Sequence, residues 1–354
     1  MDELRIDNHK LMFHVSRVNQ WLKDKDVYPI YIEIGPSGAC NHRCSFCALD
    51  YLDYKPQYLD KIILMNTLSE MARCGVKSVM YAGEGEPLLH NDIIELIIYT
   101  KRVGIDVALT TNAVLFNRNI VRQVLGALAW VRVSLNAGTP KTYSRVHHCH
   151  SEDFQRVLNN ISDTVKLKRK NNYSSTIGVQ FILLPDNYQE VSILAKQLKD
   201  RGVEYLIIKP YSQHPMSKNK LGRDLDYSKY LHLNDKLHKF SDDNFKIIFR
   251  MHTMQKLKEE KTYKRCLGLP FWTYIDSAGN VYSCSAFLGD KRFCYGNIYK
   301  NTFKEIWKGA KRKRILNMFN AELDTSKCRK ACRLDEINRY LWELKNPPLH
   351  VNFI

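Results

Sequence analysis

The sequence contains no long hydrophobic run. None of its apolar stretches approaches the roughly 20 residues that a membrane-spanning helix requires, so we expect no membrane span. The first residues, MDELRIDNHK, lack the basic start and apolar run of a secretory signal, and we therefore expect a cytoplasmic protein. No tract is polar or repetitive enough to indicate lasting disorder. In a reducing compartment the ten cysteines are not expected to form disulfides, so they need another use.

The composition indicates a globular protein with an unusual charge. The chain has 354 residues, of which 44% are hydrophobic and 26% charged, which predicts one large α/β domain or a large domain with a smaller appendage. The formal net charge is +17, and residues 261–354 hold 18 Lys and Arg against 8 Asp and Glu. This imbalance predicts a surface that attracts anions, which could be phosphorylated substrates, an acidic electron donor or nucleic acid.

A unit of strand, loop and amphipathic helix repeats between Pro29 and Tyr211. Three of the predicted helices end in a similar way: Gly75, Gly104 and Gly202 each follow directly after a helix, where a left-handed cap favours glycine. We expect strands near Ile30–Ile34, Ser78–Ala82, Asp106–Thr110, Trp130–Ser134, Gly178–Leu184 and Tyr205–Lys209. We expect helices near Leu59–Arg73, Asp92–Arg102, Arg118–Leu125, Phe154–Arg169 and Tyr188–Asp200. Six such units predict a parallel sheet, either open or curled into a partial barrel, with function at the carboxyl ends of its strands.

The alternation of predicted strands and helices ends after Tyr211, and the composition then changes. We expect a bridging helix near Tyr227–Phe240, and from about Lys261 the chain becomes rich in cysteine and aromatic residues. Thr273–Ile275 and Val281–Ser283 flank a turn sequence and predict a hairpin. We therefore divide the chain into an N-terminal extension (1–28), an α/β domain (29–225), a helical bridge (226–260) and a small second domain (261–354).

Three cysteines follow the first predicted strand in the spacing C-x3-C-x2-C. Cys40, Cys44 and Cys47 fall within eight residues at the carboxyl end of that strand. Three thiolates can hold three corners of an iron–sulfur cubane, which normally takes four cysteines, so one iron would stay open. The alternative is a zinc knuckle in which His42 or a distant residue supplies the fourth ligand.

This cysteine loop, placed after the first strand of a six-unit βα array, resembles that of the radical S-adenosylmethionine (SAM) superfamily. The resemblance implies an α/β fold with a partial (β/α)6 barrel and a 4Fe-4S cluster whose open iron binds SAM. It also implies reductive cleavage of SAM to a 5′-deoxyadenosyl radical, which removes a hydrogen atom from the substrate. A low-potential electron donor such as flavodoxin or ferredoxin would supply the electron.

Further segments match positions where the family binds SAM. Gly83-Glu84-Gly85-Glu86-Pro87 is similar to the family's glycine–glutamate–proline segment, although Glu84 intervenes where two adjacent glycines are usual. Glu86 is our choice of acceptor for the amino group of SAM, because an acidic group suits an ammonium. The predicted cofactor-binding residues are Phe46, against the adenine, together with Gly83, Gly85, Glu86, Asn112, Ser134 and Asn136.

The tract His147-His148-Cys149-His150 follows the fourth predicted strand. We expect a polar loop, because adjacent side chains rarely converge on one metal ion. The loop lies on the predicted active-site side, and the Cys149 thiol could return a hydrogen atom to a substrate radical. Cys149 is therefore the predicted catalytic residue.

The second domain resembles the SPASM and twitch extensions of radical SAM enzymes, which carry auxiliary 4Fe-4S clusters. Its five cysteines fill one cluster and leave one thiol over, whereas a full SPASM domain has seven cysteines and two clusters. The resemblance favours Cys266, Cys284, Cys328 and Cys332 as the ligands of one auxiliary cluster and leaves Cys294 as the spare thiol. A zinc site on the same four cysteines is the alternative.

Three functions remain open from the sequence. The first is a radical SAM enzyme that oxidises or epimerises a small, anionic, sugar- or nucleotide-linked substrate, with the auxiliary cluster passing electrons. The second is a maturase of a ribosomally made peptide. The third is an RNA-modifying or nucleic-acid-binding iron–sulfur protein, for which the densest basic run is Lys311-Arg312-Lys313-Arg314. We prefer a solvated helix face for that run and do not expect a nucleic-acid partner.

Overall fold

The strands come from the whole length of the chain. The structure is a computed structural model that describes residues 4–222 and 225–353. Its strands are β1 (Tyr31–Ile34), β2 (Ser78–Tyr81), β3 (Asp106–Thr111), β4 (Leu128–Ser134), β5 (Thr176–Leu183), β6 (Tyr205–Pro210), β7 (Lys246–Phe249), β8 (Trp272–Ile275), β9 (Asn280–Tyr282) and β10 (Cys294–Asn297). Among the described residues they form one 10-stranded sheet in the order β10-β9-β8-β1-β2-β3-β4-β5-β6-β7.

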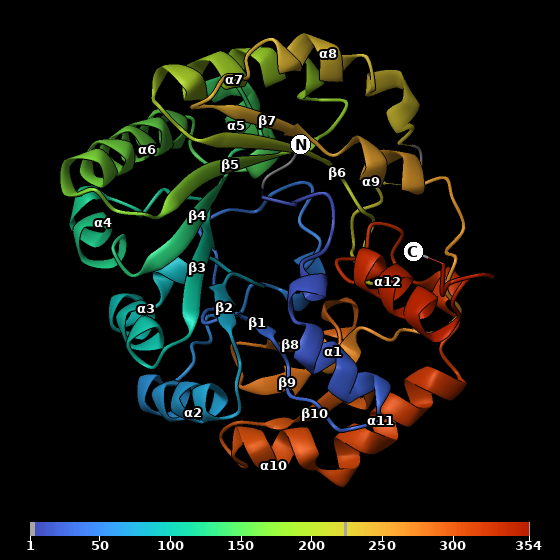
Figure 1. The fold of residues 1–354 in the computed structure, drawn as a ribbon. Coiled ribbons are helices and arrows are strands. Elements are labelled where there is room, and N and C mark those ends of the chain that lie inside the picture. Colours follow the sequence, from blue (N-terminus) through green and yellow to red (C-terminus); the bar gives the residue numbers. More distant parts are fainter. Residues whose placement is uncertain (1–3, 223–224, 354) are drawn as a thin grey trace.

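Helices separate most of these strands and cover the outside of the sheet (Figure 1). They are α1 (Val15–Leu22), α2 (Lys61–Arg73), α3 (Ile93–Arg102), α4 (Arg118–Val124), α5 (Pro140–His147), α6 (Glu152–Asn171), α7 (Val191–Asp200), α8 (Leu233–His238), α9 (Met251–Lys256), α10 (Phe303–Lys308), α11 (Ala310–Ala321) and α12 (Asp335–Lys345). Side-chain caps start several of them: Asp60, Asn117 and Thr139 accept backbone N–H groups at the beginnings of α2, α4 and α5. The glycine stops are also confirmed, since Gly75, Gly104 and Gly202 have φ of +82°, +85° and +76°.

Strands β1 to β7 pair in parallel and curve around a central space, which confirms the predicted parallel sheet. The seventh strand was not predicted. Lys246–Phe249 lies in the segment assigned to a helical bridge, yet it pairs in parallel with β6 over four residues. Four residues beyond an Asp-rich turn give almost no periodic signal, so the pairing with β6 is what defines this strand.

The second domain continues the same sheet. The predicted hairpin is confirmed as β8 and β9, and β8 pairs in parallel with β1 so that Tyr31 lies opposite Trp272 and Glu33 opposite Tyr274. The strand that precedes the cysteine loop is therefore held directly by the cysteine-rich domain.

The basic run 311–314 lies in α11, at the junction of this domain with the N-terminal segment. Arg312 is buried, stacks 3.9 Å from the centre of the Trp307 ring and pairs with Asp26 at 2.9 Å. The Trp307 indole donates to the carbonyl oxygen of Val27 at 2.8 Å. One of the four basic side chains thus serves packing, and the other three are exposed.

Alternation along the strands separates an outer face from an inner face. Ile32 and Ile34 of β1 pack with Leu64 and Leu68 of α2 in the main hydrophobic core, so Glu33 between them points to the inside of the barrel. At the amino-terminal end of the strands, Leu4 and Ile6 pack against a small inner cluster of Tyr205, Ile207 and Ile248, which closes that end. The cysteine loop begins at the opposite end, where the carboxyl ends of the strands lie.

Candidate functional site

The loop that follows β1 carries the first three predicted ligands, Cys40, Cys44 and Cys47. It is fixed to the end of α5, because the backbone N–H groups of Arg43 and Ser45 donate to the carbonyl oxygens of His147 and Val146 at 3.1 and 3.0 Å. Burial raises the pKa of Cys40 to about 12, and burial together with the neighbouring thiols Cys40 and Cys47 raises the pKa of Cys44. Thiols placed this way ionise only when a cation compensates their charge, which fits iron ligation.

The Gly83–Pro87 segment lies directly against this loop. A Cβ atom on Gly85 would sit 2.2 Å from the carbonyl oxygen of Ala39, so only glycine allows the approach. Gly83 has φ of +125°, and a Cβ atom there would meet the Tyr274 hydroxyl at 2.2 Å. The backbone N–H of Glu86 donates to the Ala39 carbonyl oxygen at 2.8 Å, which joins the two segments.

The Glu86 carboxylate is buried beside the cysteine loop. It accepts hydrogen bonds from the Thr111 hydroxyl at 2.6 Å, from the Asn112 backbone N–H at 2.8 Å and from the Leu88 backbone N–H at 3.1 Å. Burial raises the pKa of Glu86, and these three donors lower it. A carboxylate offers about four acceptor sites, so one site is left over for an ammonium group. The chemistry of Glu86 therefore suits the predicted amino-group acceptor.

Of the other predicted cofactor-binding residues, some lie at the cysteine loop and others are buried in the protein interior. Asn112 donates from its side chain to the Asn41 side-chain oxygen at 2.7 Å, which places it at the cysteine loop. Ser134 faces the inside of the barrel, where its hydroxyl accepts from Gln180 at 2.8 Å. Asn136 is fully buried, and its side-chain oxygen accepts from the Ile182 backbone N–H at 2.6 Å. Phe46 is 7% exposed within the hydrophobic core, so its predicted contact with adenine stays a prediction.

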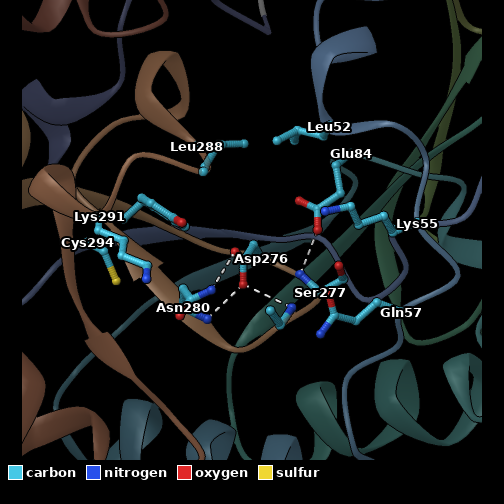
Figure 2. A pocket seen from close by; sticks show the side chains of 14 residues that line it. Leu52, Lys55, Gln57, Glu84, Asp276, Ser277, Asn280, Leu288, Lys291 and Cys294 are labelled. Carbon is cyan, nitrogen blue, oxygen red and sulfur yellow. Dashed lines mark hydrogen bonds between the residues drawn. The ribbon is translucent and has the colours of Figure 1, made fainter.

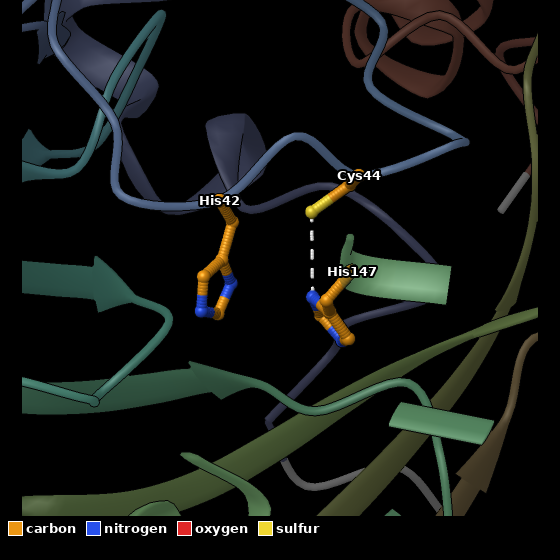
Figure 3. A group of neighbouring side chains, drawn as sticks. All are labelled: His42, Cys44 and His147. Carbon is orange, nitrogen blue, oxygen red and sulfur yellow. Dashed lines mark hydrogen bonds between the residues drawn. The ribbon is translucent and has the colours of Figure 1, made fainter. Parts of the chain in front are cut away.

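Two histidines lie close to Cys44: His42, which the sequence offered as a zinc ligand in the alternative to an iron–sulfur cluster, and His147, to which it gave no role of its own. Figure 3 shows the rings of His42 and His147 next to each other beside Cys44, with the His147 ring directed at the sulfur. The Nδ1 atom of His147 lies 3.3 Å from the Cys44 Sγ, and the ligand atoms of the three residues lie within 4.8 Å of one another. A zinc ion here would use one of the three loop cysteines, whereas an iron–sulfur cluster would use all three. Sequence spacing could not show this contact, because 103 residues separate its partners.

Cys149 lies beside His42 of the cysteine loop. Its Sγ groups with His42 and Asp153 within 4.8 Å, and burial raises its pKa to about 12. The tract 147–150 therefore contains one buried histidine, His147, and a half-buried thiol, while His148 and His150 are exposed. The predicted hydrogen-donor role of Cys149 stays a prediction.

The second domain gathers Cys266, Cys284, Cys328 and Cys332. Burial raises the pKa of Cys266 well above its usual value, and the charges of the other three thiols raise it further. Polar hydrogens point at the sulfurs: the backbone N–H groups of Ala286 and Leu334 lie 3.4 Å from the Sγ atoms of Cys284 and Cys332. Such donors stabilise thiolates that bind a metal cluster, so this donor set fits four-cysteine ligation.

Cys294 lies apart from this group. Its thiol donates to the carbonyl oxygen of Gly296 at 3.2 Å, and burial is the largest cause that raises its pKa, whereas the charges of neighbouring thiols raise that of Cys266. The position of Cys294 is consistent with its assignment as the spare thiol, which stays a prediction.

A pocket of about 280 Å³ lies between the β8–β9 hairpin and the loop that follows β1 (Figure 2). Its lining includes Glu84, Asp276 and Cys294 and none of the seven predicted ligand cysteines. Glu84 accepts from the Ser277 backbone N–H at 2.7 Å and from the Tyr274 hydroxyl at 3.0 Å, and burial raises its pKa to about 7. Asp276 accepts from the Asn280 backbone N–H at 2.7 Å within the hairpin turn. The Glu84 carboxyl group thus serves the domain contact and that of Asp276 the hairpin turn, and we place the functional site at the barrel opening instead.

Comparison with protein families gives two matches. Residues 34–198 match the model described as the radical SAM superfamily, and residues 266–333 match the model described as an iron-sulfur cluster-binding domain, SPASM. These domains imply 4Fe-4S clusters and SAM binding, as predicted. Within residues 4–222 and 225–353, no helix is both long enough and apolar enough to cross a membrane.

Curated relatives match over part of their length. GTP 3′,8-cyclase of Chlorobaculum tepidum is 28% identical over 189 residues, which are 52% of this chain and 55% of the relative. The chain thus spans about half the length of this relative. AdoMet-dependent heme synthase of Methanosarcina barkeri is 26% identical over 263 residues, which are 69% of this chain and 71% of the relative.

Solved structures show the same fold. SuiB of Streptococcus suis, bound to the precursor peptide SuiA, has a TM-score of 0.65 at 19% identity, covering 84% of this chain and 69% of that chain. SuiB bound to S-adenosylmethionine has a TM-score of 0.65 at 20% identity, covering 85% and 70%. The predicted fold class, a partial barrel with a small C-terminal iron–sulfur domain, is confirmed.

Proposed function

Because the chain is a radical SAM protein that carries a C-terminal SPASM domain, we propose that it is an enzyme that abstracts a hydrogen atom from a small anionic substrate. The net reaction would be an oxidation or an epimerisation. The observation that carries the proposal is the placement of three clustered thiols at the carboxyl end of β1, directly against the buried carboxylate of Glu86.

In this proposal the protein binds and orients, and the bound groups supply the redox chemistry. Cys40, Cys44 and Cys47 would hold a 4Fe-4S cluster, and Glu86 would accept a hydrogen bond from the amino group of SAM at its fourth acceptor site. When bound, the cluster and SAM supply the 5′-deoxyadenosyl radical that takes the hydrogen atom. Asn112 holds the cysteine loop through Asn41 and so fixes the orientation of the site.

The second set of thiols has a separate task. Cys266, Cys284, Cys328 and Cys332 would occupy all four irons of an auxiliary 4Fe-4S cluster, which leaves no position for a substrate. Such a cluster suits electron transfer, either from a substrate radical or towards the first cluster. A low-potential donor such as flavodoxin or ferredoxin would be the external partner, and the positive excess in residues 261–354 would attract an acidic protein of this kind.

The charge of the chain and the names of its relatives support the proposed substrate class. GTP 3′,8-cyclase, a relative that matches half of this chain, is named for a nucleotide. The net charge of +17 favours an anion in the same way. A peptide substrate is the second candidate, because SuiB, which shares the fold, is solved with a precursor peptide bound. The basic run in α11 does not form a continuous nucleic-acid-binding face, since Arg312 is buried.

Anaerobic reconstitution and product analysis test the proposal. The wild-type protein should bind about eight irons per chain, four for each of two cubanes, and should form 5′-deoxyadenosine from SAM with a strong reductant. Joint replacement of Cys40, Cys44 and Cys47 by Ala should leave about four irons and abolish 5′-deoxyadenosine. Continued cleavage of SAM by that variant would refute the proposal. Deuterium transfer from labelled small molecules or peptides into 5′-deoxyadenosine would then separate the two substrate classes.

A further inference from the structure

The inside of the barrel is lined with cationic side chains below the cysteine loop. On β4, Val131 and Val133 pack in the outer core, so Arg132 between them points inwards. The same alternation on β6, where Leu206 and Ile208 are in the outer core, turns Lys209 inwards. The Lys209 ammonium donates to the Gln180 side-chain oxygen at 3.0 Å, and Gln180 in turn donates to the Ser134 hydroxyl at 2.8 Å.

The second domain adds two arginines to this interior. Arg333 pairs with Glu33 of β1 at 2.5 Å and donates to the Tyr31 hydroxyl at 3.1 Å. The Arg333 side chain is 39% exposed although strands β1 and β8 flank it, so it lines a space that solvent can enter. Arg329 donates to the hydroxyl and carbonyl oxygens of Ser212, each at 3.2 Å, just beyond the end of β6.

The positive charges in this interior outnumber the negative ones. The pKa of Lys209 is lowered to about 7. Burial is the largest cause, and the next is repulsion from the positive charges of Arg132, Arg250, Arg329 and Arg333. Arg250 pairs with Asp7, and Arg333 pairs with Glu33. In the described part of the chain, Arg132, Lys209 and Arg329 have no ion pair with a carboxylate. The Arg132 Nε atom is also buried without a hydrogen-bond partner.

Like charges held together inside a protein destabilise it unless an anion neutralises them. We propose that Arg132, Lys209 and Arg329 bind a phosphate or diphosphate group of the substrate inside the barrel. Arginine forks and a lysine point charge are suited to phosphate oxygens, and Ser134 and Gln180 supply neutral polar groups beside them. This inference rests on the proposed function, because it names the substrate class of the same site.

The position of these three cationic side chains fits a role in binding the substrate. Lys209 and Ser134 stand near the carboxyl ends of β6 and β4, the edge at which the cysteine loop follows β1. Arg329 lies between Cys328 and Cys332 in the sequence, and the charges of Cys284 and Cys332 act on it. A phosphate held there would lie at the edge of the sheet from which the predicted SAM-binding loop begins.

Binding of inorganic pyrophosphate to the reconstituted holoenzyme tests the inference at constant ionic strength by calorimetry. Lys209→Gln should weaken pyrophosphate binding at least tenfold, while Lys209→Arg should retain it. Lys196→Gln, which removes one exposed lysine from α7, is the matched control and should bind as the wild type does. Unchanged affinity in Lys209→Gln, or tighter binding of citrate than of pyrophosphate, would overturn the inference.

The same proteins separate this inference from the proposed function. Iron content and substrate-free formation of 5′-deoxyadenosine are measured on the wild type and should be the same in the control Lys196→Gln, whose lysine is exposed on α7. If the wild type cleaves SAM but does not bind pyrophosphate, the inference fails and the proposed function stands. If it binds pyrophosphate but never cleaves SAM, the proposed function fails and the anion site stands.

A second inference comes from the ring of His147. The backbone N–H of Asn136 donates to the Nε2 atom of His147 at 3.2 Å, so Nε2 carries no proton. A neutral imidazole then has its proton on Nδ1, which lies 3.3 Å from the Cys44 sulfur (Figure 3). The geometry points to His147 as a positioning residue that donates a hydrogen bond to a sulfur ligand of the first cluster.

A hydrogen bond to a ligating sulfur stabilises the more negative, reduced form of a cluster. His147→Phe should therefore lower the midpoint potential of the SAM-binding cluster in a redox titration followed by electron paramagnetic resonance. His147→Gln, which can still donate, should lower it less, and His150→Gln, an exposed neighbour, should leave it unchanged. Equal potentials in the wild type and in His147→Phe, with full iron content, would overturn this inference.

Discussion

A single methyl group on Gly85 should displace the predicted SAM-binding loop. A Cβ atom at this position would lie 2.2 Å from the Ala39 carbonyl oxygen and 2.5 Å from the Ser37 carbonyl oxygen. Real Cβ contacts stay above 3.0 Å, so the two segments must separate by roughly 1 Å. Both acceptors belong to the backbone just before Cys40, which cannot rotate away as a side chain could.

The expected size of the effect follows from that displacement. A shift of about 1 Å in a catalytic site costs on the order of 100-fold in rate. Gly85→Ala should therefore lower the rate of 5′-deoxyadenosine formation about 100-fold, and the strained packing should destabilise the fold by about 1–3 kcal/mol. The rate is measured by chromatography of 5′-deoxyadenosine after addition of reductant, on protein reconstituted to full iron content.

Gly104→Ala is the matched control. Gly104 has φ of +85°, and a Cβ atom there would meet nothing within 4 Å. The substitution should cost about 1–2 kcal/mol of stability through backbone strain, with no loss in the rate of SAM cleavage. Wild-type cleavage in Gly85→Ala, or an equal loss in Gly104→Ala, would refute the reasoning.

Four further substitutions test other parts of the protein. Burial raises the pKa of Glu84 from 4.5 to about 7, so the free energy of unfolding falls as the pH rises through that window and the carboxyl group ionises. Glu84→Gln should therefore raise the free energy of unfolding by up to about 3 kcal/mol above pH 7 and leave it little changed at pH 4. Cys294→Ala should keep about eight irons per chain, whereas Cys266→Ala should keep about four, and equal iron contents would contradict the ligand assignment. Cys149→Ala should lose an epimerised product while forming 5′-deoxyadenosine normally, and an unchanged product would end its assignment as hydrogen donor.

The sequence predicted the elements whose signals are local. Alternating Val and Ile residues with glycine stops located six parallel strands, and the positive φ angles of Gly75, Gly104 and Gly202 show why the stops could be recognised. The strand β7 was missed, because four residues, KIIF, carry too short a period and only pairing with β6 defines them. The direct continuation of the sheet from β1 into β8 was also beyond the sequence, since some 240 residues separate those strands.

The residues of the candidate site also fall into those with a local sequence signal and those that only the fold brings together. The spacing of Cys40, Cys44 and Cys47 is a local pattern, so it could be found from the sequence. The contact of His147 with Cys44 and the gathering of Arg132, Lys209 and Arg329 join residues from distant segments, each unremarkable in its own surroundings. Such clusters form only when the barrel closes, which is why charge counting predicted an anion but not its position.

Glu84 explains how the two domains are held in one geometry. This residue departs from the family's adjacent glycines, and its carboxylate is directed away from the predicted SAM site, to the Tyr274 hydroxyl and the Ser277 backbone N–H. Both partners belong to the β8–β9 hairpin, whose first strand pairs with β1. The loop that carries Cys40 and the hairpin that leads to Cys284 are thus fixed to each other by strand pairing and by a buried carboxylate. These two contacts on neighbouring strands resist hinge motion, so the relative position of the two predicted cluster sites is set by the sheet rather than by a flexible linker.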